Sequence, residues 1–589
     1  MAKVARRLRR RISQGLQRSH GLLSDVVVDE SIRLLGPAAS GTRRLLLLTD
    51  ASSADLDAVR KLARRYRGFD TVVVRFVPVS ARDVGAQRRD LTVHDVDGLS
   101  ALSRTLRQVA PPDIVVDLTD DGTWPRERLW RRSFLHLVQG GVYVAGHRGK
   151  SEAGGDACAR TAMQVVDARA RGALATLPNP RDRAIAPFVE SLTLAPTHTL
   201  MVKRGIHYLK VHEHEVGPVV NGRSSTVTVE VVARRSKGVL TSGTRVHGAP
   251  ARYASEFATV VPFPPATVRD YAGPVTVGPK GLVYADGLIL PEAFRYPHEP
   301  RLKNAATRDV DRAFARIPPK HLAVKSLPGT YFHLDPYLAS HFGHLMLESV
   351  SRLWGWEHAR ERHPDAKVIF RTKSPGDRFS TLERALLGAY GIAASDIVFV
   401  DRPVRVDRLV GASPLLHYSA PYTVNPSIKA TWERIGDALV DPHGSLAGDR
   451  IFVSRKPGRT NRECRNAPTV EEFFRQRGFT VLYPEDLSLN EQATAFAHAR
   501  VIAGFGGSAM LSLVYARRVE TVIVLSQEGY TARNEHLISL LLDCDVHYLW
   551  SKGDVEHPED GWRRDAFFSA WDFDWEQNEV PLRELLAAA

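Results

Sequence analysis

Residues 450–455 and 478–516 read RIFVSR and GFTVLYPEDLSLNEQATAFAHARVIAGFGGSAMLSLVYA, and these stretches decide the fold of the C-terminal part of the chain. The first predicts a short apolar strand, and the second a strand over 480–483, a helix and a further strand. Ser488 followed three residues later by Glu491 is typical of a helix capping box. Strands that alternate with helices at this spacing indicate a parallel α/β sheet.

A glycine-rich turn and a run of arginines follow two of these strands. Gly507 and Ser508 lie between a strand over 500–504 and a helix over 509–516, where backbone N–H groups favour an anion. The strand over 450–455 ends in Arg455, and the loop that follows it holds Arg459, Arg462 and Arg465. Guanidinium groups at the carboxyl end of a strand can pair with phosphate oxygens, so we favour anion binding over a solvated basic loop.

A third motif lies upstream, where residues 341–354 read HFGHLMLESVSRLW and predict an amphipathic helix. His344 and Glu348 are four residues apart, so their side chains project from one helical face. A carboxylate one turn from an imidazole can hold a base in position. The alternative is an ordinary surface ion pair or helix cap.

The N-terminal part alternates apolar strands and helices over residues 43–146, which indicates a doubly wound parallel sheet. Within it, PPDIVVDLTDDG (111–122) and FLHLVQGGVYVAG (134–146) resemble the second half of S-adenosylmethionine-dependent methyltransferases. Where that family has a glycine-rich loop after its first strand, residues 45–55 read LLLLTDASSAD. Because those glycines let the backbone approach the cofactor, we expect a methyltransferase-like domain with a degenerate site, or a Rossmann-like unit used for packing.

The order of the C-terminal motifs resembles glycosyltransferase family 61 over roughly residues 280–550. The resemblance implies a GT-B-type fold of two facing Rossmann-like domains, with a nucleotide-sugar donor between them. It also implies inverting transfer without a metal, so we expect no cofactor, and neither Asp543–Cys544–Asp545 nor Asp572–Phe573–Asp574 is expected to bind a metal.

Carried onto this chain, the resemblance implies two groups of site residues. The catalytic pair would be His344 and Glu348, with the choice of base between them left open. The donor would be held by Arg455, Arg459, Arg462, Asn466, Glu491, Gln492, Gly504, Gly507 and Ser508.

Five segments are expected. They are a basic amphipathic helix (1–20), a methyltransferase-like domain (21–190), a strand-rich connector (191–280) and two GT-B lobes (281–435 and 436–589, the latter with the tail). The predicted fold class is therefore α/β, with a GT-B-type pair of Rossmann-like domains preceded by a Rossmann-like domain and the connector.

Charge is unevenly distributed along the chain, whose net charge is +14. Half of it lies in residues 1–18, where seven Lys and Arg residues surround the apolar positions Val4, Leu8, Ile12 and Leu16. This pattern favours a helix on an anionic membrane surface, and the alternative is a solvated terminus. No nucleic-acid motif follows it, so nucleic acid is not an expected partner.

Three widely spaced cysteines, the lack of an uninterrupted apolar signal region and the lack of an 18-residue apolar run predict a cytoplasmic protein, peripheral at the inner face of the plasma membrane. We expect the acceptor to be a hydroxyl of a cell-surface polysaccharide or a lipid-linked glycan precursor. Two alternatives remain: a bifunctional protein with an active methyltransferase domain, and a non-catalytic glycan-binding scaffold.

Overall fold

The computed structural model describes residues 25–35, 42–50, 56–77, 91–119, 124–146, 157–195, 197–249, 251–372, 378–444, 447–456, 458 and 461–588. The helix expected over 1–20 and the predicted site residue Arg459 lie outside these residues. The chain forms two compact units. The first unit comprises Met1–Val229, Tyr284–Pro291 and Arg301–Leu322, and the second comprises Glu230–Val283, Glu292–Pro300 and Ala323–Ala589.

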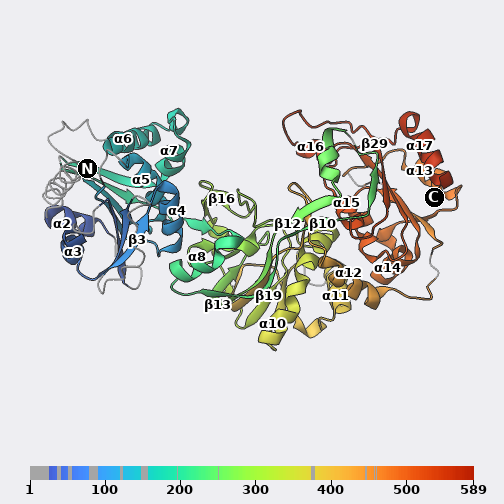
Figure 1. Ribbon diagram of the computed structural model, residues 1–589, viewed down its shortest axis with the longest axis horizontal. Coiled ribbons are helices and arrows are strands. Elements are labelled where there is room, and N and C mark those ends of the chain that lie inside the picture. Colours follow the sequence, from blue (N-terminus) through green and yellow to red (C-terminus); the bar gives the residue numbers. More distant parts are fainter. Residues whose placement is uncertain are drawn as a thin grey trace, which may run out of the picture. The chain divides into compact units, whose positions relative to one another are not determined.

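The first unit contains a seven-stranded sheet in the order β3-β2-β1-β4-β5-β7-β6. Figure 1 labels β3 of this sheet, near the N-terminal end of the chain. Its strands are β1 (Arg43–Thr49), β2 (Phe69–Phe76), β3 (Thr92–Val96), β4 (Ile114–Asp117), β5 (Val142–Gly146), β6 (Val189–Ala195) and β7 (His198–Lys203). The first five are mutually parallel, whereas β7 is antiparallel to both β5 and β6. The parallel sheet predicted from the alternation of strands and helices is therefore present.

Both faces of this sheet are covered by helices. Leu45 and Leu47 of β1 pack with residues of the helices α2 (Asp25–Leu34) and α3 (Leu56–Arg65). The alternate residues Leu46 and Leu48 are buried on the other face of the sheet. This explains why the strand reads as a continuous apolar run. Further helices of the unit are α4 (Leu99–Gln108), α5 (Arg126–Ser133), α6 (Ala157–Ala170), α7 (Pro180–Ile185) and α8 (Val216–Arg223).

The expected boundary at residue 190 differs from the structure, because it falls inside β6. Buried residues of β7, among them Leu200 and Met201, complete the first sheet, so the expected connector is divided between the units. The first unit also contains three short strands, of which the first pairs with the other two. They are β8 (Tyr208–Lys210), β15 (Leu288–Ile289) and β17 (Phe314–Arg316).

The second unit contains two groups of strands. One is a fully parallel sheet in the order β11-β29-β28-β27-β25-β26. Its strands are β11 (Arg245–His247), β25 (Arg450–Val453), β26 (Thr480–Leu482), β27 (Val501–Phe505), β28 (Thr521–Gln527) and β29 (Asp545–Ser551). The other runs β13-β22-β19-β20-β21, with β13 antiparallel to β22 and the rest parallel. Its strands are β13 (Ala266–Val277), β19 (Thr330–His333), β20 (Lys367–Arg371), β21 (Ile397–Val400) and β22 (Val404–Ala412).

One core cluster joins the two strand groups of the second unit. It combines Phe332 and Val368 with Ile451, Ile502 and Val522. The helices around it are α10 (Trp356–Arg362), α11 (Arg378–Tyr390), α12 (Ile428–Leu439), α14 (Leu489–His498), the 3₁₀ helix η14 (Ser508–Tyr515) and α15 (Asn534–Ser539). A second cluster covers the other face of the parallel sheet and includes residues of α13 (Ala467–Arg475) and α17 (Trp575–Ala588). The short helix α16 (Arg564–Phe567) precedes α17 in the chain.

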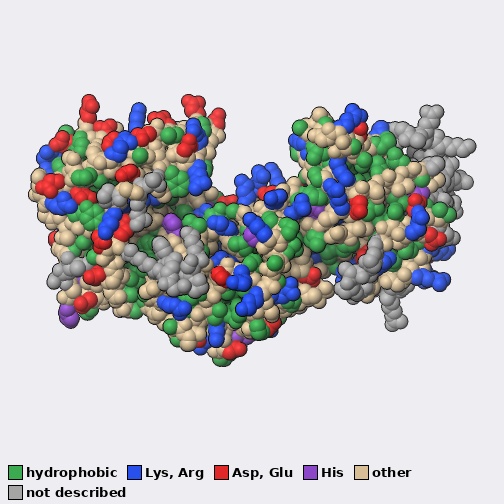
Figure 2. Space-filling model, turned by 180° about the vertical axis from the view of Figure 1, so that it is seen from behind, with side chains coloured by type: hydrophobic (Ala, Val, Ile, Leu, Met, Phe, Trp, Pro, Cys, Tyr) green, Lys and Arg blue, Asp and Glu red, His purple; other side chains and the backbone are tan. Residues whose placement is uncertain are grey.

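Charged side chains of both signs are interspersed on the face of the molecule drawn in Figure 2. None of the helices in the described ranges is long and apolar enough to cross a membrane.

Candidate active site

The segment that carries His344 and Glu348 is helical, as predicted. It is not the regular helix expected, because three kinds of helical turn follow one another. It consists of one α turn, α9 (Phe342–His344), a π turn, η10 (Leu345–Ser349), and a 3₁₀ stretch, η11 (Val350–Gly355). His341 caps its start by accepting a hydrogen bond from the His344 N–H. π turns inside helices occur frequently at functional sites.

Glu348 is a buried carboxylate with four donors around it. Its Oε1 accepts hydrogen bonds from Arg295 Nε (2.8 Å), His344 Nδ1 (2.8 Å) and the Tyr418 hydroxyl (3.1 Å). Its Oε2 accepts one from the Tyr337 N–H (2.7 Å). Burial alone would raise the pKa of Glu348, but the charge of Arg295 and the His344 hydrogen bond outweigh it and lower this pKa to about 2.

This arrangement assigns different roles to the two residues. An ionised carboxylate only accepts hydrogen bonds, so the Nδ1 of His344 is the donor and its Nε2 is left as an acceptor. The imidazole keeps 17% of its side-chain surface exposed, whereas Glu348 keeps 7%. The His341 and Tyr337 rings flank it, with centroids 4.9 and 5.9 Å away. Glu348 therefore orients His344, and the Nε2 of His344 is the atom able to take a proton.

The glycine turn lies against this helix. β27 ends at Phe505, and η14 begins at Ser508. A Cβ added to Gly343 would lie 2.7 Å from the Ser508 hydroxyl oxygen, which shows how closely the start of α9 approaches the start of η14. Gly504 is packed inside the sheet, where a Cβ would lie 2.7 Å from the Val453 carbonyl oxygen.

Gly507 has a φ of 144°, a conformation that favours glycine. Its N–H donates a 2.7 Å hydrogen bond to the buried carboxylate of Glu535. Burial raises the pKa of Glu535, although this bond and the nearby charges of Arg462 and Arg533 oppose the shift. The Glu535 side chain, on α15, thus holds the backbone of the glycine turn in place through this hydrogen bond.

Arg462 lies beside the same turn. A Cβ added to Gly507 would be 3.3 Å from its Nη2. Its guanidinium carbon is 4.5 Å from the centroid of the Tyr530 ring, and its buried Nε has no hydrogen-bond partner within the part of the chain that the structure describes. Arg455, half-buried after β25, is close enough for its charge to act on the Tyr530 hydroxyl. The structure therefore brings Arg462 to the glycine turn and Arg455 near Tyr530, which lies beside Arg462.

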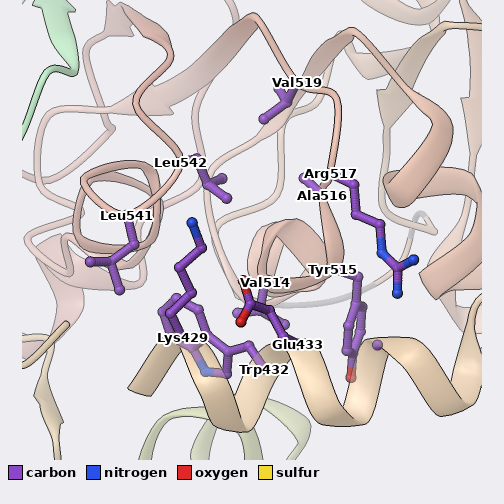
Figure 3. Close-up of a pocket in the computed structure, with 11 residues that line it drawn as sticks. Lys429, Trp432, Glu433, Val514, Tyr515, Ala516, Arg517, Val519, Leu541 and Leu542 are labelled. Atoms are coloured by element: carbon purple, nitrogen blue, oxygen red, sulfur yellow. The ribbon is translucent and has the colours of Figure 1, made fainter. Parts of the chain in front are cut away.

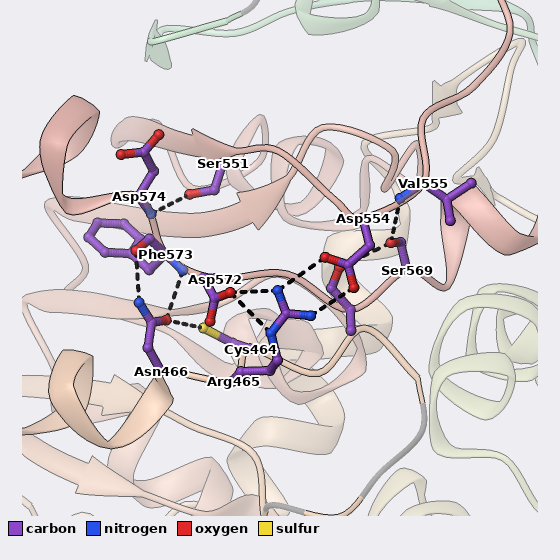
Figure 4. A network of polar contacts seen from close by, with 11 residues as sticks. Cys464, Arg465, Asn466, Ser551, Asp554, Val555, Ser569, Asp572, Phe573 and Asp574 are labelled. Carbon is purple, nitrogen blue, oxygen red and sulfur yellow. Dashed lines mark hydrogen bonds and ion pairs between the residues drawn. The ribbon is translucent and has the colours of Figure 1, made fainter.

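Other predicted donor residues have structural partners away from the turn. Asn466 bonds through its side chain to the backbone of Phe573, accepting at 2.8 Å and donating at 2.9 Å (Figure 4). Glu491 completes the predicted capping box with Ser488, which is confirmed. Gln492 is buried and donates to the carbonyl oxygens of Pro484 and Leu487.

The two Asp-x-Asp sequences are also engaged by protein groups. Asp543 accepts from the Gly243 N–H and Asp545 pairs with Arg245. Asp572 pairs with Arg465, as Figure 4 shows, and Asp574 accepts from the Gln577 N–H. No group of three or more His, Cys, Asp or Glu side chains suited to a metal ion occurs within the described ranges.

Sequence reasoning missed four residues of the site: Arg295, Tyr337, Tyr418 and Glu535. Arg295 and Tyr418 lie in loop segments with no motif around them, 53 and 70 residues from Glu348 in sequence. Only the fold brings them to the carboxylate.

A pocket of about 230 Å³ lies elsewhere in the second unit, between α12 and the end of η14 (Figure 3). Trp432, Tyr515 and Leu541 are among its lining residues. Because η14 starts at the glycine turn and ends at Tyr515, the pocket is at the far end of this helix and contains no predicted site residue.

In the first unit, the carboxyl end of β4 holds a buried polar network. Asp117 accepts hydrogen bonds from the N–H and hydroxyl of Thr119 (3.0 and 2.6 Å) and from the Tyr143 hydroxyl (2.9 Å). Arg126 donates to the carbonyl oxygen of Thr119 (2.8 Å). Asp117, Thr119, Arg126 and Tyr143 are all buried.

Comparisons with known proteins give one family and a few structural similarities. Residues 342–524 match the family model described as Glycosyltransferase 61. No curated protein matches the chain. A structure of the MycE methyltransferase from the mycinamycin biosynthetic pathway with Mg, SAH and mycinamycin VI is 16% identical, with a TM-score of 0.24, and the match covers 30% of this chain and 48% of that chain.

A second MycE structure, with Mg and SAH in crystal form 1, is 14% identical with a TM-score of 0.25, covering 30% of this chain and 49% of that chain. The chain thus spans about half the length of the solved structures that it matches. The methyltransferase-like character of the first unit stays a prediction. The matched segment contains His344, Glu348, Arg462 and the Gly507–Ser508 turn. Over residues 342–524, the segment that holds the site described above, the chain is therefore similar to glycosyltransferase family 61.

Proposed function

We propose that the protein is an inverting, metal-independent glycosyltransferase that moves a sugar from a nucleotide-sugar donor to an acceptor hydroxyl, with His344 as the general base. One observation carries this proposal. The helix start that carries the oriented imidazole lies against the glycine turn at the start of another helix, and Arg462, whose Nε has no hydrogen-bond partner among the described residues, stands beside that turn.

The proposed step uses these groups in turn. The acceptor hydroxyl gives its proton to the Nε2 of His344 while its oxygen forms a bond to the anomeric carbon of the sugar. The bond from that carbon to the diphosphate oxygen breaks on the opposite face, so the anomeric configuration inverts. Glu348 stabilises the imidazolium that forms, as a carboxylate paired with a catalytic histidine does.

The leaving nucleoside diphosphate takes up negative charge. Arg462 and Arg455 would meet this charge together with the first N–H groups of η14, which have no partner within that helix. Preorganised donors of this kind typically contribute about 3–4 kcal/mol each to transition-state stabilisation. Cations and N–H groups would thus supply the charge stabilisation that a metal provides in other transferases.

We assign the two strand groups of the second unit to the two lobes of a GT-B-type fold. His344 follows the lobe with β19, and Arg462 and the glycine turn belong to the lobe with β27. This division would let one lobe bring the base and the acceptor while the other holds the donor. The proposed acceptor is a cell-surface polysaccharide or a lipid-linked glycan precursor, reached from the cytoplasmic side by a protein that lies at the membrane surface.

The test is a transfer assay over a panel of nucleotide sugars, with an excess of chelator and with manganese in parallel. We expect hydrolysis or transfer of one donor, no loss with chelator, and an inverted anomer by NMR of the first product. Retention of configuration, or activity that depends on manganese, would contradict the mechanism. No turnover with any donor would favour a non-catalytic glycan-binding scaffold.

A further inference from the structure

An exposed tryptophan lies near the arginine site, outside the segment that matches the family. The residue Trp562 has 58% of its surface exposed. Single exposed apolar side chains are common on protein surfaces, so the surroundings of the indole decide whether it can serve a ligand. Its surroundings show that its orientation is fixed by the fold.

Hydrogen bonds hold the indole and the histidine beside it. The Trp562 Nε1 donates to the Thr531 hydroxyl at 3.3 Å. The His557 ring lies beside the indole, with centroids 6.1 Å apart and ring planes inclined by 29°. That ring is held at both nitrogens, because Nε2 bonds the Gly529 carbonyl oxygen at 2.9 Å and Nδ1 accepts from the Arg563 N–H at 3.0 Å.

The loop that presents Trp562 is anchored at its start. Arg465 donates from both terminal nitrogens to the carboxylate of Asp554, at 2.7 and 3.0 Å, and also pairs with Asp572 (Figure 4). The Val555 N–H donates to the Ser569 hydroxyl at 3.0 Å. An arginine of the predicted basic loop therefore fixes the loop rather than meeting an anion itself.

An aromatic strip leads from the indole to Arg462. The Trp562 and Phe567 ring centroids are 5.8 Å apart, and the guanidinium carbon of Arg462 is 5.4 Å from the Phe567 centroid. Tyr530 lies beside both, 5.2 Å from Phe567 and 4.5 Å from the guanidinium. A cation beside the glycine turn and a flat exposed ring are thus separated by one aromatic side chain.

We infer that Trp562 is the platform on which the base of the nucleotide-sugar donor stacks, with the diphosphate at Arg462. This rests on the proposed function and adds the subsite for the base. A nucleoside diphosphate has the same layout, with charge at one end and a flat ring at the other. Stacking on an aromatic side chain is tolerant of base identity because every base has a π-face.

The position of the platform favours the donor over an acceptor glycan. Trp562 belongs to the same part of the unit as Arg462 and the glycine turn, whereas the proposed base His344 belongs to the other strand group. The loop around the indole carries Glu556, Glu559 and Asp560, which disfavour a second anionic group there and suit a neutral ring with its ribose hydroxyls.

The experiment compares binding of uridine diphosphate, guanosine diphosphate and inorganic pyrophosphate to the full-length protein by calorimetry. For Trp562→Ala we expect binding of the preferred nucleoside diphosphate to weaken about tenfold, as loss of one stacked base does. Binding of pyrophosphate should stay unchanged. Trp562→Phe should restore most of the affinity, and Val260→Ala, which trims another exposed apolar side chain, should leave both ligands unaffected.

The outcomes separate this inference from the proposed function. If the wild type transfers sugar and Trp562→Ala binds the nucleoside diphosphate as tightly as before, the platform is wrong and the function stands. An unchanged donor affinity with a raised KM for the acceptor would overturn it too, and would assign the indole to the acceptor. A wild type that binds no nucleoside diphosphate and has no turnover would overturn both.

Discussion

Asp117 in the first unit and Glu348 in the second are buried carboxylates with similar near neighbours. Each accepts a hydrogen bond from a tyrosine hydroxyl, at 2.9 Å from Tyr143 and 3.1 Å from Tyr418. Each also accepts one from a backbone N–H, at 3.0 and 2.7 Å. Both lie in a unit built on parallel strands. On this inventory alone the two would have the same role.

Their remaining partners differ. Arg126, near Asp117, donates to a carbonyl oxygen, and burial raises the pKa of Asp117 in spite of its hydrogen bonds and the nearby charge. Glu348 instead receives a guanidinium directly and an imidazole that reaches solvent. The hydrogen bonds of Glu348 thus lead to a partly exposed imidazole, which suits the proposed base, whereas those described for Asp117 lead to buried groups.

The largest effect on transfer should come from removing the His344 imidazole, the partly exposed partner of Glu348. We expect His344→Ala to lower transfer about 10³-fold, the range typical of a lost general base, while donor affinity measured by calorimetry changes little. His498→Ala, at the end of α14, is the matched control and should keep full activity. Substantial transfer by His344→Ala would assign the base elsewhere.

Glu348→Gln tests the carboxylate itself. It should lower transfer about 100-fold, the lower end of the range for general base catalysis, because His344 stays in place but loses the charge that stabilises its imidazolium. It should also reduce the free energy of unfolding by about 3 kcal/mol, because it leaves Arg295 without its buried charge partner. Tyr418→Phe removes one of the four hydrogen bonds and keeps the charge, so it should cost only about 1 kcal/mol. Urea titrations of the three proteins measure these changes, and equal losses in both variants would show that the charge is unimportant.

The same carboxylate predicts a pH dependence of stability. The pKa of Glu348 is lowered from 4.5 to about 2 in the folded protein, so its contribution is present above pH 4.5 and lost as the pH falls towards 2. A shift of this size corresponds to about 3 kcal/mol. The difference in unfolding free energy between wild type and Glu348→Gln should therefore shrink between pH 5 and pH 3, and a constant difference would contradict the assignment.

The smallest effect on stability and transfer is expected from replacing Asp117 in the first unit. The raised pKa of Asp117 has the opposite sign, so its contribution is complete below the usual value of 3.8 and declines as the pH rises. At neutral pH, Asp117→Asn removes a costly buried charge and keeps groups able to bond Thr119 and Tyr143. We expect a change within about 1 kcal/mol and unaltered transfer. A loss above about 3 kcal/mol would show that the Asp117 charge is needed.

Local sequence was sufficient for features that depend on neighbouring residues. The strands of both units, the Ser488–Glu491 capping box and the His344–Glu348 contact follow from periodicity, side-chain chemistry and a four-residue spacing. The irregular helix around Glu348 did not follow, because a π turn is set by the packing of buried residues over 345–349 and not by helix propensity.

The sequence by itself determined the α/β class, the strand-to-helix glycine turn and the pairing of an imidazole with a carboxylate. The tertiary structure adds a difference between the two side chains, because Arg295 and Tyr418 reach Glu348 from distant segments and bond its carboxylate. This difference is the basis for proposing His344 as the base. The tertiary structure also separated Arg462, beside Gly507, from Arg465, which anchors the loop of Trp562. The physical reason is that charge and burial depend on neighbours in space, which the fold sets by joining segments distant in sequence.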